Sequence, residues 1–226
     1  AVAADLLTAD ERSVVWVSND RFAAIHHAPL SVADYLKETL LERSTVVMTS
    51  ATLAVAGNMD VTAAAMGFAG ADKGRTWASL DVGSPFDYAK QGILYCAATL
   101  DPPSQSGTPQ AALDELEALI EAAGGRTLAL FSSWRGVERA AEHLKRAFAD
   151  REDRPLIVAQ RGDSVSELVR RFRDEPRSSL LGTVSLWQGI DVPGESCTLV
   201  VIDRIPFPRP DDPVVSARAA RVDASG

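Results

Sequence analysis

The second half of the chain alternates short apolar runs with amphipathic stretches of helical period. The apolar runs predict strands at residues 127–131, 156–159, 179–182 and 198–203. The stretches between them place apolar side chains on one face, and they predict helices at residues 111–123, 132–149 and 165–174. Because strands that are apolar on both faces need cover on both sides, this order indicates an α/β fold with a parallel sheet between helices.

The first half of the chain has a less regular pattern. We predict a strand at residues 13–17, a helix at residues 31–42, a buried strand at residues 45–48 and a further strand at residues 93–97. Three prolines, two serines and one glycine between residues 101 and 109 indicate a loop or linker before the more regular half begins.

Composition places the chain among ordinary globular proteins, since 46% of its 226 residues are hydrophobic and 24% are charged. The formal net charge of −8 provides no overall positive field for nucleic acid. Any contact with DNA must therefore use a local patch or backbone N–H groups. Two cysteines, Cys96 and Cys197, exclude a disulfide scaffold and cannot form a zinc or iron–sulfur site by themselves.

Targeting signals are also missing from the sequence. No run of about 18 apolar residues occurs, so we predict no membrane span and no membrane partner. The first residues, Ala-Val-Ala-Ala-Asp-Leu-Leu, lack a basic segment, so we expect that they are not a signal peptide. We expect a cytoplasmic protein.

Small hydroxyl residues and glycines, with one acid and one tryptophan, follow several predicted strands. Ligands of parallel sheets bind outside the carboxyl ends of the strands, so these positions are candidates for a functional site. Hydroxyl groups and helix N-termini donate hydrogen bonds to phosphate without needing net positive charge. The candidates are Ser50, Thr52, Ser132, Trp134, Thr183, Ser185, Gly189 and Asp191.

Several of these segments resemble motifs of the DinG/XPD-like superfamily 2 DNA helicases, in the order of that family. Residues 49–53 (Thr-Ser-Ala-Thr-Leu) are similar to motif III, and residues 131–134 are similar to motif IV. Residues 160–163 resemble a Q-G-D segment, residues 180–194 resemble motif V, and residues 201–210 resemble the stretch that follows it. Motif III alone is a weak signal, whereas the block from Leu180 to Pro210 is specific.

The resemblance implies an ATP-driven motor that moves on single-stranded DNA and is built from two RecA-like domains. Residues 1–82 would be the C-terminal part of the first domain, and residues 83–226 would be most of the second. The family also implies 5′-to-3′ movement, unwinding of duplex in DNA repair or replication, and a monomer.

The resemblance further assigns a role to each candidate residue. Ser50 and Thr52 would couple the nucleotide state to the grip on DNA. Gly189 and Asp191 would face the ATP cleft. The residues that would contact DNA are Ser132, Trp134, Thr183 and Ser185.

Motifs I, II and VI of the family are absent from these residues. Gly74-Arg75-Thr76 has Arg where the phosphate-binding loop needs Lys. Residues 114–117 (Asp-Glu-Leu-Glu) match the motif II acids in letters but lie inside a predicted helix. The arginine finger would follow downstream, and the cysteine ligands of a family iron–sulfur cluster would lie upstream. The full protein would use ATP and Mg²⁺, whereas we predict no metal site and negligible ATPase activity for this chain alone.

Five of the eight candidates also have an ordinary structural interpretation that the sequence leaves open. Ser50 and Thr52 could cap a strand-to-helix turn, and Ser132 with Ser133 could cap the following helix. Trp134 could pack on the sheet, and Asp191 could be a turn residue.

Two other functions also fit the resemblance. Some DinG-like chains join a motor to an exonuclease domain and act as nucleases. A non-hydrolysing module could instead hold single-stranded DNA or a protein partner. Salt-dependent binding to single strands without any effect of nucleotide would favour that module.

Overall fold

The computed structural model describes residues 11–19, 22–68, 77–101, 107–188, 190–207 and 211–225. The chain divides into two compact units, one formed by Ala1–Gly92 with Pro208–Gly226 and the other by Ile93–Phe207. The division falls after residue 92, and the predicted assignment of residues 1–82 and 83–226 to two motor domains stays a prediction.

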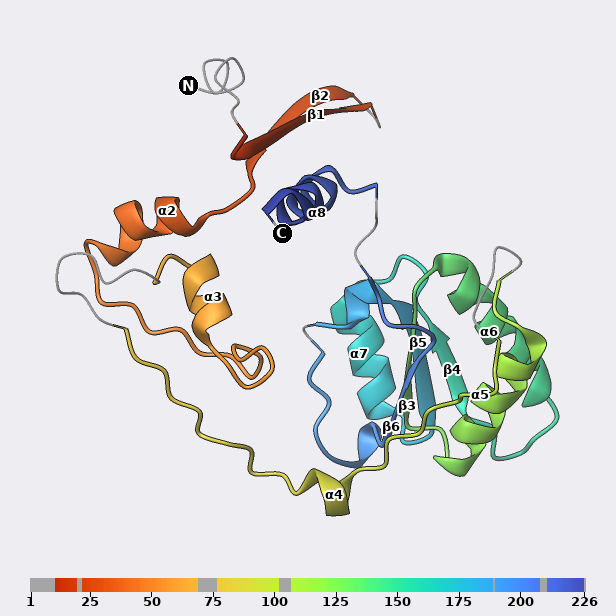
Figure 1. Ribbon diagram of the computed structural model, residues 1–226. Helices are drawn as coiled ribbons and strands as arrows, with labels where there is room; N and C mark the ends of the chain where they lie inside the picture. The colour runs from red at the N-terminus through yellow and green to blue at the C-terminus, as the bar shows by residue number, and fades with distance from the viewer. Residues whose placement is uncertain are drawn as a thin grey trace. The chain divides into compact units, whose positions relative to one another are not determined.

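The Ile93–Phe207 unit is an α/β domain, as the sequence predicts (Figure 1). Its four strands are all parallel and lie in the order β4-β5-β3-β6. The strands are β3 Thr127–Phe131, β4 Leu156–Ala159, β5 Ser178–Thr183 and β6 Leu199–Ile202. The helices are α5 Gln110–Ala122, α6 Trp134–Ala147 and α7 Val165–Asp174, with 3₁₀ turns at Val184–Leu186 and Gly194–Ser196. All four predicted strands and all three predicted helices of this half are confirmed, with small differences at their ends.

Alternation along β3 divides the hydrophobic core between the two faces of the sheet. Ala129 and Phe131 pack with Ile120 of α5 and Leu144 of α6. The alternate residues of the strand belong to a second cluster, on the side of α7. Its members include Leu128, Leu130, Val158, Leu168 and Phe172. The helices lie on both sides of the strands in Figure 1, which explains why β3 is apolar at every position except Thr127.

Glycine ends α5 at a position where only glycine fits. Gly124 and Gly125 have φ angles of 65° and 87°, and the amide of Gly125 donates to the carbonyl of Ile120 over 2.9 Å. A Cβ atom on Gly125 would lie 2.5 Å from the carbonyl oxygen of Arg177, just before β5. The predicted Gly-Gly ending of this helix is therefore confirmed, and it also lets the chain pass close to the neighbouring strand.

The other unit contains an antiparallel hairpin and short helices. Its elements are β1 Ser13–Asn19, β2 Ala23–Pro29, α2 Ala33–Leu36 with a π-helical turn at Lys37–Leu41, α3 Asp60–Ala65, α4 Tyr88–Gln91 and α8 Pro213–Ser225. The strand predicted at residues 13–17 is confirmed as β1, and the helix predicted at residues 31–42 is α2 with its π-helical turn. Arg218 of α8 donates a hydrogen bond of 2.9 Å to the carbonyl of Leu30 after the hairpin.

Two predicted strands are not formed. Residues 45–48 and residues 93–97 carry no secondary structure, and Val47 and Ile93 are 83% and 98% exposed. Both strand predictions are wrong, and so is the burial predicted for residues 45–48. The apolar pattern alone does not form a strand, because a strand also needs a neighbour for its backbone N–H and C=O groups. Among the described residues no strand pairs with either segment.

A search of the described residues for membrane spans finds no helix both long and apolar enough to cross a bilayer.

Candidate nucleic-acid interface

The carboxyl ends of the four parallel strands bring polar side chains to one edge of the sheet. Ser132 follows β3, Gln160 follows β4, Thr183 ends β5 with Ser185 just after it, and Asp203 follows β6. Because β5 and β3 are the two central strands, their polar residues lie between those of β4 and β6. We call this set the carboxyl-edge cluster.

Gln160 connects the end of β4 to the end of β5. Its Oε1 accepts hydrogen bonds from the backbone N–H and the hydroxyl of Thr183, over 3.0 and 3.3 Å. Its Nε2 donates to the Ser185 hydroxyl over 2.8 Å. The two hydroxyl oxygens are themselves 3.3 Å apart. The side chain of Gln160 therefore holds two of the predicted DNA-contacting residues, Thr183 and Ser185, in one arrangement.

Asp203 connects the end of β6 to the end of β3 in the same way. It accepts hydrogen bonds from the Ser132 backbone N–H over 2.9 Å and from the Ser132 hydroxyl over 3.1 Å. Its side chain is only 8% exposed, and Arg204 Nε lies 4.0 Å from Oδ2. Burial raises the pKa of the Asp203 carboxyl above its ordinary value, although the hydrogen bonds from Ser132 act in the opposite direction. The Ser132 hydroxyl proton is thus directed toward Asp203.

Ser133 caps α6 and places Trp134 at the first position of that helix. The Ser133 hydroxyl accepts a hydrogen bond of 3.1 Å from the backbone N–H of Gly136, as expected for an N-cap. Trp134 is 51% exposed. Half of its surface is open to solvent, an exposure that suits a ligand contact better than the alternative of packing on the sheet.

Positive charge also lies near this edge, although the chain as a whole is acidic. Arg135, Arg161 and Arg204 each follow a strand within four residues, and all three are exposed. Arg161 and Arg204 lie in the connections after β4 and β6, and Arg135 is the second residue of α6 after β3, so guanidinium groups follow three of the four strands in the sequence. Guanidinium and hydroxyl groups are both common in contacts with phosphate.

The predicted ATP-cleft residues are placed only in part. Asp191 is exposed, and Gly189 lies outside the described residues. Trp187, between Ser185 and Gly189, packs against the α7 side of the core.

Ser50 and Thr52 lie in the other compact unit, where they interact with each other. The backbone N–H of Thr52 donates to the Ser50 hydroxyl over 3.2 Å, and the two hydroxyl oxygens are 3.2 Å apart. Both residues are exposed. The two residues form a local turn, but no strand directly precedes it and the next helix begins only at Asp60, so the alternative of capping a strand-to-helix turn is not formed. Their role in coupling stays a prediction.

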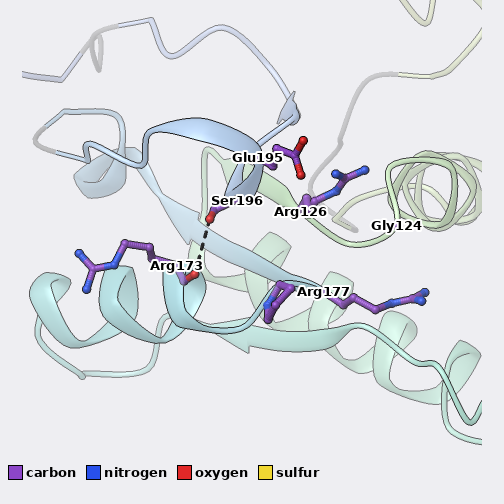
Figure 2. A pocket seen from close by; sticks show the side chains of 7 residues that line it. Gly124, Arg126, Arg173, Arg177, Glu195 and Ser196 are labelled. Carbon is purple, nitrogen blue, oxygen red and sulfur yellow. Dashed lines mark hydrogen bonds between the residues drawn. The ribbon is translucent and has the colours of Figure 1, made fainter.

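A cavity of about 310 Å³ opens at the opposite edge of the sheet, near the amino ends of β3, β5 and β6. Arg126, Arg173, Arg177 and Glu195 are among its lining residues. Figure 2 shows the three arginine side chains extending in different directions. Arg173 pairs with Asp174, and Arg177 pairs with Asp153. These guanidinium groups point in different directions and already have partners. The cavity is therefore a weaker candidate for a ligand site than the carboxyl-edge cluster.

Two central members of the carboxyl-edge cluster were not among the predicted site residues. Gln160 lies in the segment that resembles Q-G-D, and Asp203 lies at the end of the predicted strand 198–203 and in the stretch 201–210 that resembles the family, but neither was given a role. The sequence could have indicated both residues as site candidates, because each directly follows an apolar strand and ligands bind at the carboxyl ends of such strands.

Among the described residues, no group of three or more His, Cys, Asp or Glu side chains could hold a metal ion. The carboxyl edge carries hydroxyl groups, with arginines following three of its strands, and its connections after the strands contain no lysine. These groups suit a phosphate backbone, whereas the β/γ-phosphates of ATP are normally cradled with the help of a lysine.

Comparison with known proteins agrees with this architecture. Residues 116–226 match the helicase C-terminal domain family. The chain is 49% identical over 223 residues to the ATP-dependent helicase DinG of Mycobacterium tuberculosis H37Rv, covering 96% of this chain and 32% of the relative. It is 33% identical over 192 residues to the ATP-dependent DNA helicase YoaA of Escherichia coli K12, covering 84% of this chain and 28% of the relative.

A third relative is named differently. The chain is 28% identical over 218 residues to the 3′-5′ exonuclease DinG of Bacillus subtilis, covering 92% of this chain and 23% of the relative. The chain thus spans about a third or less of the length of the curated relatives it matches. From the matched domain and the parallel sheet, we conclude that residues 116–226 belong to the helicase C-terminal domain family and that the chain is similar to one part of DinG-type helicases.

Proposed function

We propose that these residues form part of an ATP-dependent DNA helicase that translocates 5′ to 3′ on single-stranded DNA and unwinds duplex in DNA repair or replication. The observation that carries the proposal is the carboxyl-edge cluster, in which Gln160 holds Thr183 and Ser185 at the end of β5, while the exposed Trp134 begins the helix that follows the neighbouring strand β3. Names of two relatives, ATP-dependent helicase and ATP-dependent DNA helicase, support the same activity.

Contact with single-stranded DNA would use two kinds of interaction. The hydroxyl groups of Thr183 and Ser185 would hydrogen-bond to backbone phosphate, which positions a strand without reading its sequence. The indole ring of Trp134 would stack on a base, and stacking is tolerant of sequence because every base has an aromatic face. A motor that travels along any DNA needs both properties.

Coupling to ATP would use residues of both units. Gly189 and Asp191 would face the nucleotide cleft, and Ser50 and Thr52 would transmit the nucleotide state to the grip on DNA. ATP hydrolysis with Mg²⁺ would supply the free energy for movement. Because the phosphate-binding lysine, the magnesium-binding acid and the arginine finger are absent from these residues, we expect hydrolysis only in a protein that supplies them. We further propose a cytoplasmic monomer.

The experiment begins with the complete reading frame that encodes these residues. We expect a G-x-x-x-x-G-K-[ST] loop and an Asp-Glu pair upstream, and Q-x-x-G-R-x-x-R downstream. The purified product should hydrolyse ATP when single-stranded DNA is added, and it should unwind a duplex that carries a 5′ tail but not one that carries a 3′ tail. A frame without the lysine, or a product that hydrolyses no ATP with DNA present, would rule out the motor.

One observation favours a second candidate, a motor joined to a nuclease. The Bacillus subtilis relative is named a 3′-5′ exonuclease. Shortening of a 5′-labelled oligonucleotide from its 3′ end by the full product, in the presence of Mg²⁺ and without ATP, would support that candidate. An intact oligonucleotide together with ATP-dependent unwinding would support the helicase.

A further inference from the structure

Gln160 is a buried polar residue whose bonding groups are all directed to one loop. It is 8% exposed, and its side chain bonds only to Thr183 and Ser185 among the described residues. Of the polar residues buried in the described part of the chain, it alone carries a side-chain amide. Burying an amide is costly unless its hydrogen bonds are made, so these bonds fix its orientation.

The backbone of Thr183 determines which way the Gln160 amide faces. A backbone N–H can only donate, and the Thr183 N–H lies 3.0 Å from one of the two amide atoms. That atom must therefore be the oxygen, Oε1. It follows that Nε2 is the atom 2.8 Å from the Ser185 hydroxyl, and Nε2 can only donate.

The hydroxyl protons of Ser185 and Thr183 consequently have different directions. Since the Ser185 oxygen accepts from Gln160, its own proton remains available to another acceptor. The Thr183 hydroxyl donates to Gln160 Oε1, so its proton points inward. Ser185 is exposed, and the only neighbouring acceptor for its proton that is recorded in the described residues is Thr183 Oγ1, at a long 3.3 Å.

We propose that Gln160 is a positioning residue that presents the Ser185 hydroxyl as a hydrogen-bond donor to a phosphate oxygen of single-stranded DNA. Phosphate oxygens only accept hydrogen bonds, so a serine whose proton faces outward is the matching partner. The inference rests on the proposed function of this edge, and it deepens that function by naming the donor and the group that orients it.

A double-mutant cycle with Gln160→Met and Ser185→Ala tests the inference. Binding of the full product to a labelled oligothymidylate is measured by fluorescence anisotropy, and folding of each variant is checked by thermal unfolding. We expect Ser185→Ala to weaken binding about tenfold, as for the loss of one hydrogen bond to a charged group. Gln160→Met should weaken binding to a similar extent in the native background and by less than about twofold in the Ser185→Ala background, because contacting residues are coupled.

A matched control uses the same change at an exposed glutamine outside the cluster. Gln110 of α5 bonds to Asp114 and His143 rather than to the carboxyl edge. Gln110→Met should leave DNA affinity unchanged. If Gln160→Met weakens binding equally with and without Ser185, the residue does not act through Ser185 and the inference is wrong.

Gln160→Glu provides a second test if the methionine variant is unstable. The carboxylate can still accept from Thr183 but cannot donate, so the Ser185 proton would turn inward and affinity should fall. Protonation at lower pH restores one donor, and affinity should recover in the native background more than in the Ser185→Ala background. Equal recovery in both backgrounds would reduce the effect to charge repulsion and overturn the inference.

The results also separate this inference from the proposed function. If Ser185→Ala itself has no effect on binding, the DNA contact at this edge fails, and the positioning role of Gln160 fails with it. If Ser185→Ala weakens binding while both Gln160 variants bind normally, the DNA contact stands and only the inference about Gln160 is rejected.

Discussion

At the scale of single residues, the carboxyl-edge cluster distinguishes hydroxyl groups that look alike in the sequence. Ser132 donates its proton to Asp203, Ser133 accepts from the backbone of α6, and Ser185 accepts from Gln160. Ser133 and Ser185 therefore both keep a proton that can be donated, whereas Ser132 does not, and of these two Ser185 is the one in the carboxyl-edge cluster. The prediction that Ser132 contacts DNA directly stays untested, and its hydrogen bonds give it a structural task at the end of β3.

Trp134→Ala should weaken binding to single-stranded DNA without unfolding the domain. Stacking of one base on an aromatic ring contributes on the order of 1–3 kcal/mol, so the dissociation constant should rise between about fivefold and about a hundredfold. Because Trp134 is 51% exposed, its removal leaves no cavity in the core. Anisotropy of a labelled oligothymidylate measures the change.

Trp134→Phe is the matched variant, because it keeps an aromatic face. It should retain most of the affinity that alanine loses. Equal affinity of all three proteins would place Trp134 outside the DNA contact.

Asp203→Asn should change how stability depends on pH. Burial raises the pKa of Asp203 above its ordinary value of 3.8, so the native state holds this proton more tightly than the unfolded state. The contribution of Asp203 to stability is therefore fully present below pH 3.8 and is lost as pH rises through the raised native pKa. Asparagine is uncharged at every pH, so the variant does not lose this stability as pH rises.

Denaturant unfolding of Asp203→Asn and the native chain over a pH series measures the difference. The free energy of unfolding of the asparagine variant, relative to the native chain, should increase from pH 3.8 upward and then become constant. A difference that is flat, or that falls with pH, would show that burial does not dominate at this carboxyl group.

At the scale of elements, the helices begin and end where local chemistry predicts. Ser133 caps α6, Ser164 caps α7, and Gly124-Gly125 end α5. Strands behaved differently: β3, β4, β5 and β6 lie where apolar runs predict them, whereas residues 45–48 and 93–97 remain unpaired. A helix satisfies its own backbone, but a strand depends on a neighbour.

Ser133→Ala should destabilise the Ile93–Phe207 unit by about 1 kcal/mol through the loss of the cap on α6. Denaturant unfolding measures the change. Ser164→Ala is the matched control, since Ser164 accepts a hydrogen bond of 3.2 Å from the Glu167 backbone N–H in the same manner. Similar losses in both variants, with unchanged DNA affinity, would assign Ser133 to capping alone. A selective loss of affinity in Ser133→Ala would add a DNA contact.

At the scale of the whole molecule, charge and motif content constrain what these residues do alone. The net charge of −8 provides no general attraction to DNA, so binding depends on the local groups of the carboxyl edge. The motor also requires groups that these residues do not include, since no G-x-x-x-x-G-K-[ST] loop occurs in the sequence.

The 226-residue chain by itself should therefore hydrolyse ATP at a negligible rate, with or without single-stranded DNA. Even the loss of an arginine finger costs on the order of 10³-fold in rate, and the phosphate-binding lysine and the magnesium-binding acid are absent as well. A phosphate-release assay measures the rate. Hydrolysis that rises on addition of DNA would contradict the assignment of the missing motifs.

The sequence by itself determined the α/β class, the positions of the four parallel strands and the resemblance to the DinG/XPD-like helicases. These follow from local periodicity and from motifs that are contiguous in the chain. Only the tertiary structure decided which polar groups meet. Ser132 and Asp203 are separated by 71 residues, and Gln160 and Ser185 are separated by 25. A hydroxyl group can serve as donor or acceptor, and its partner depends on the strand order β4-β5-β3-β6, which no local pattern encodes.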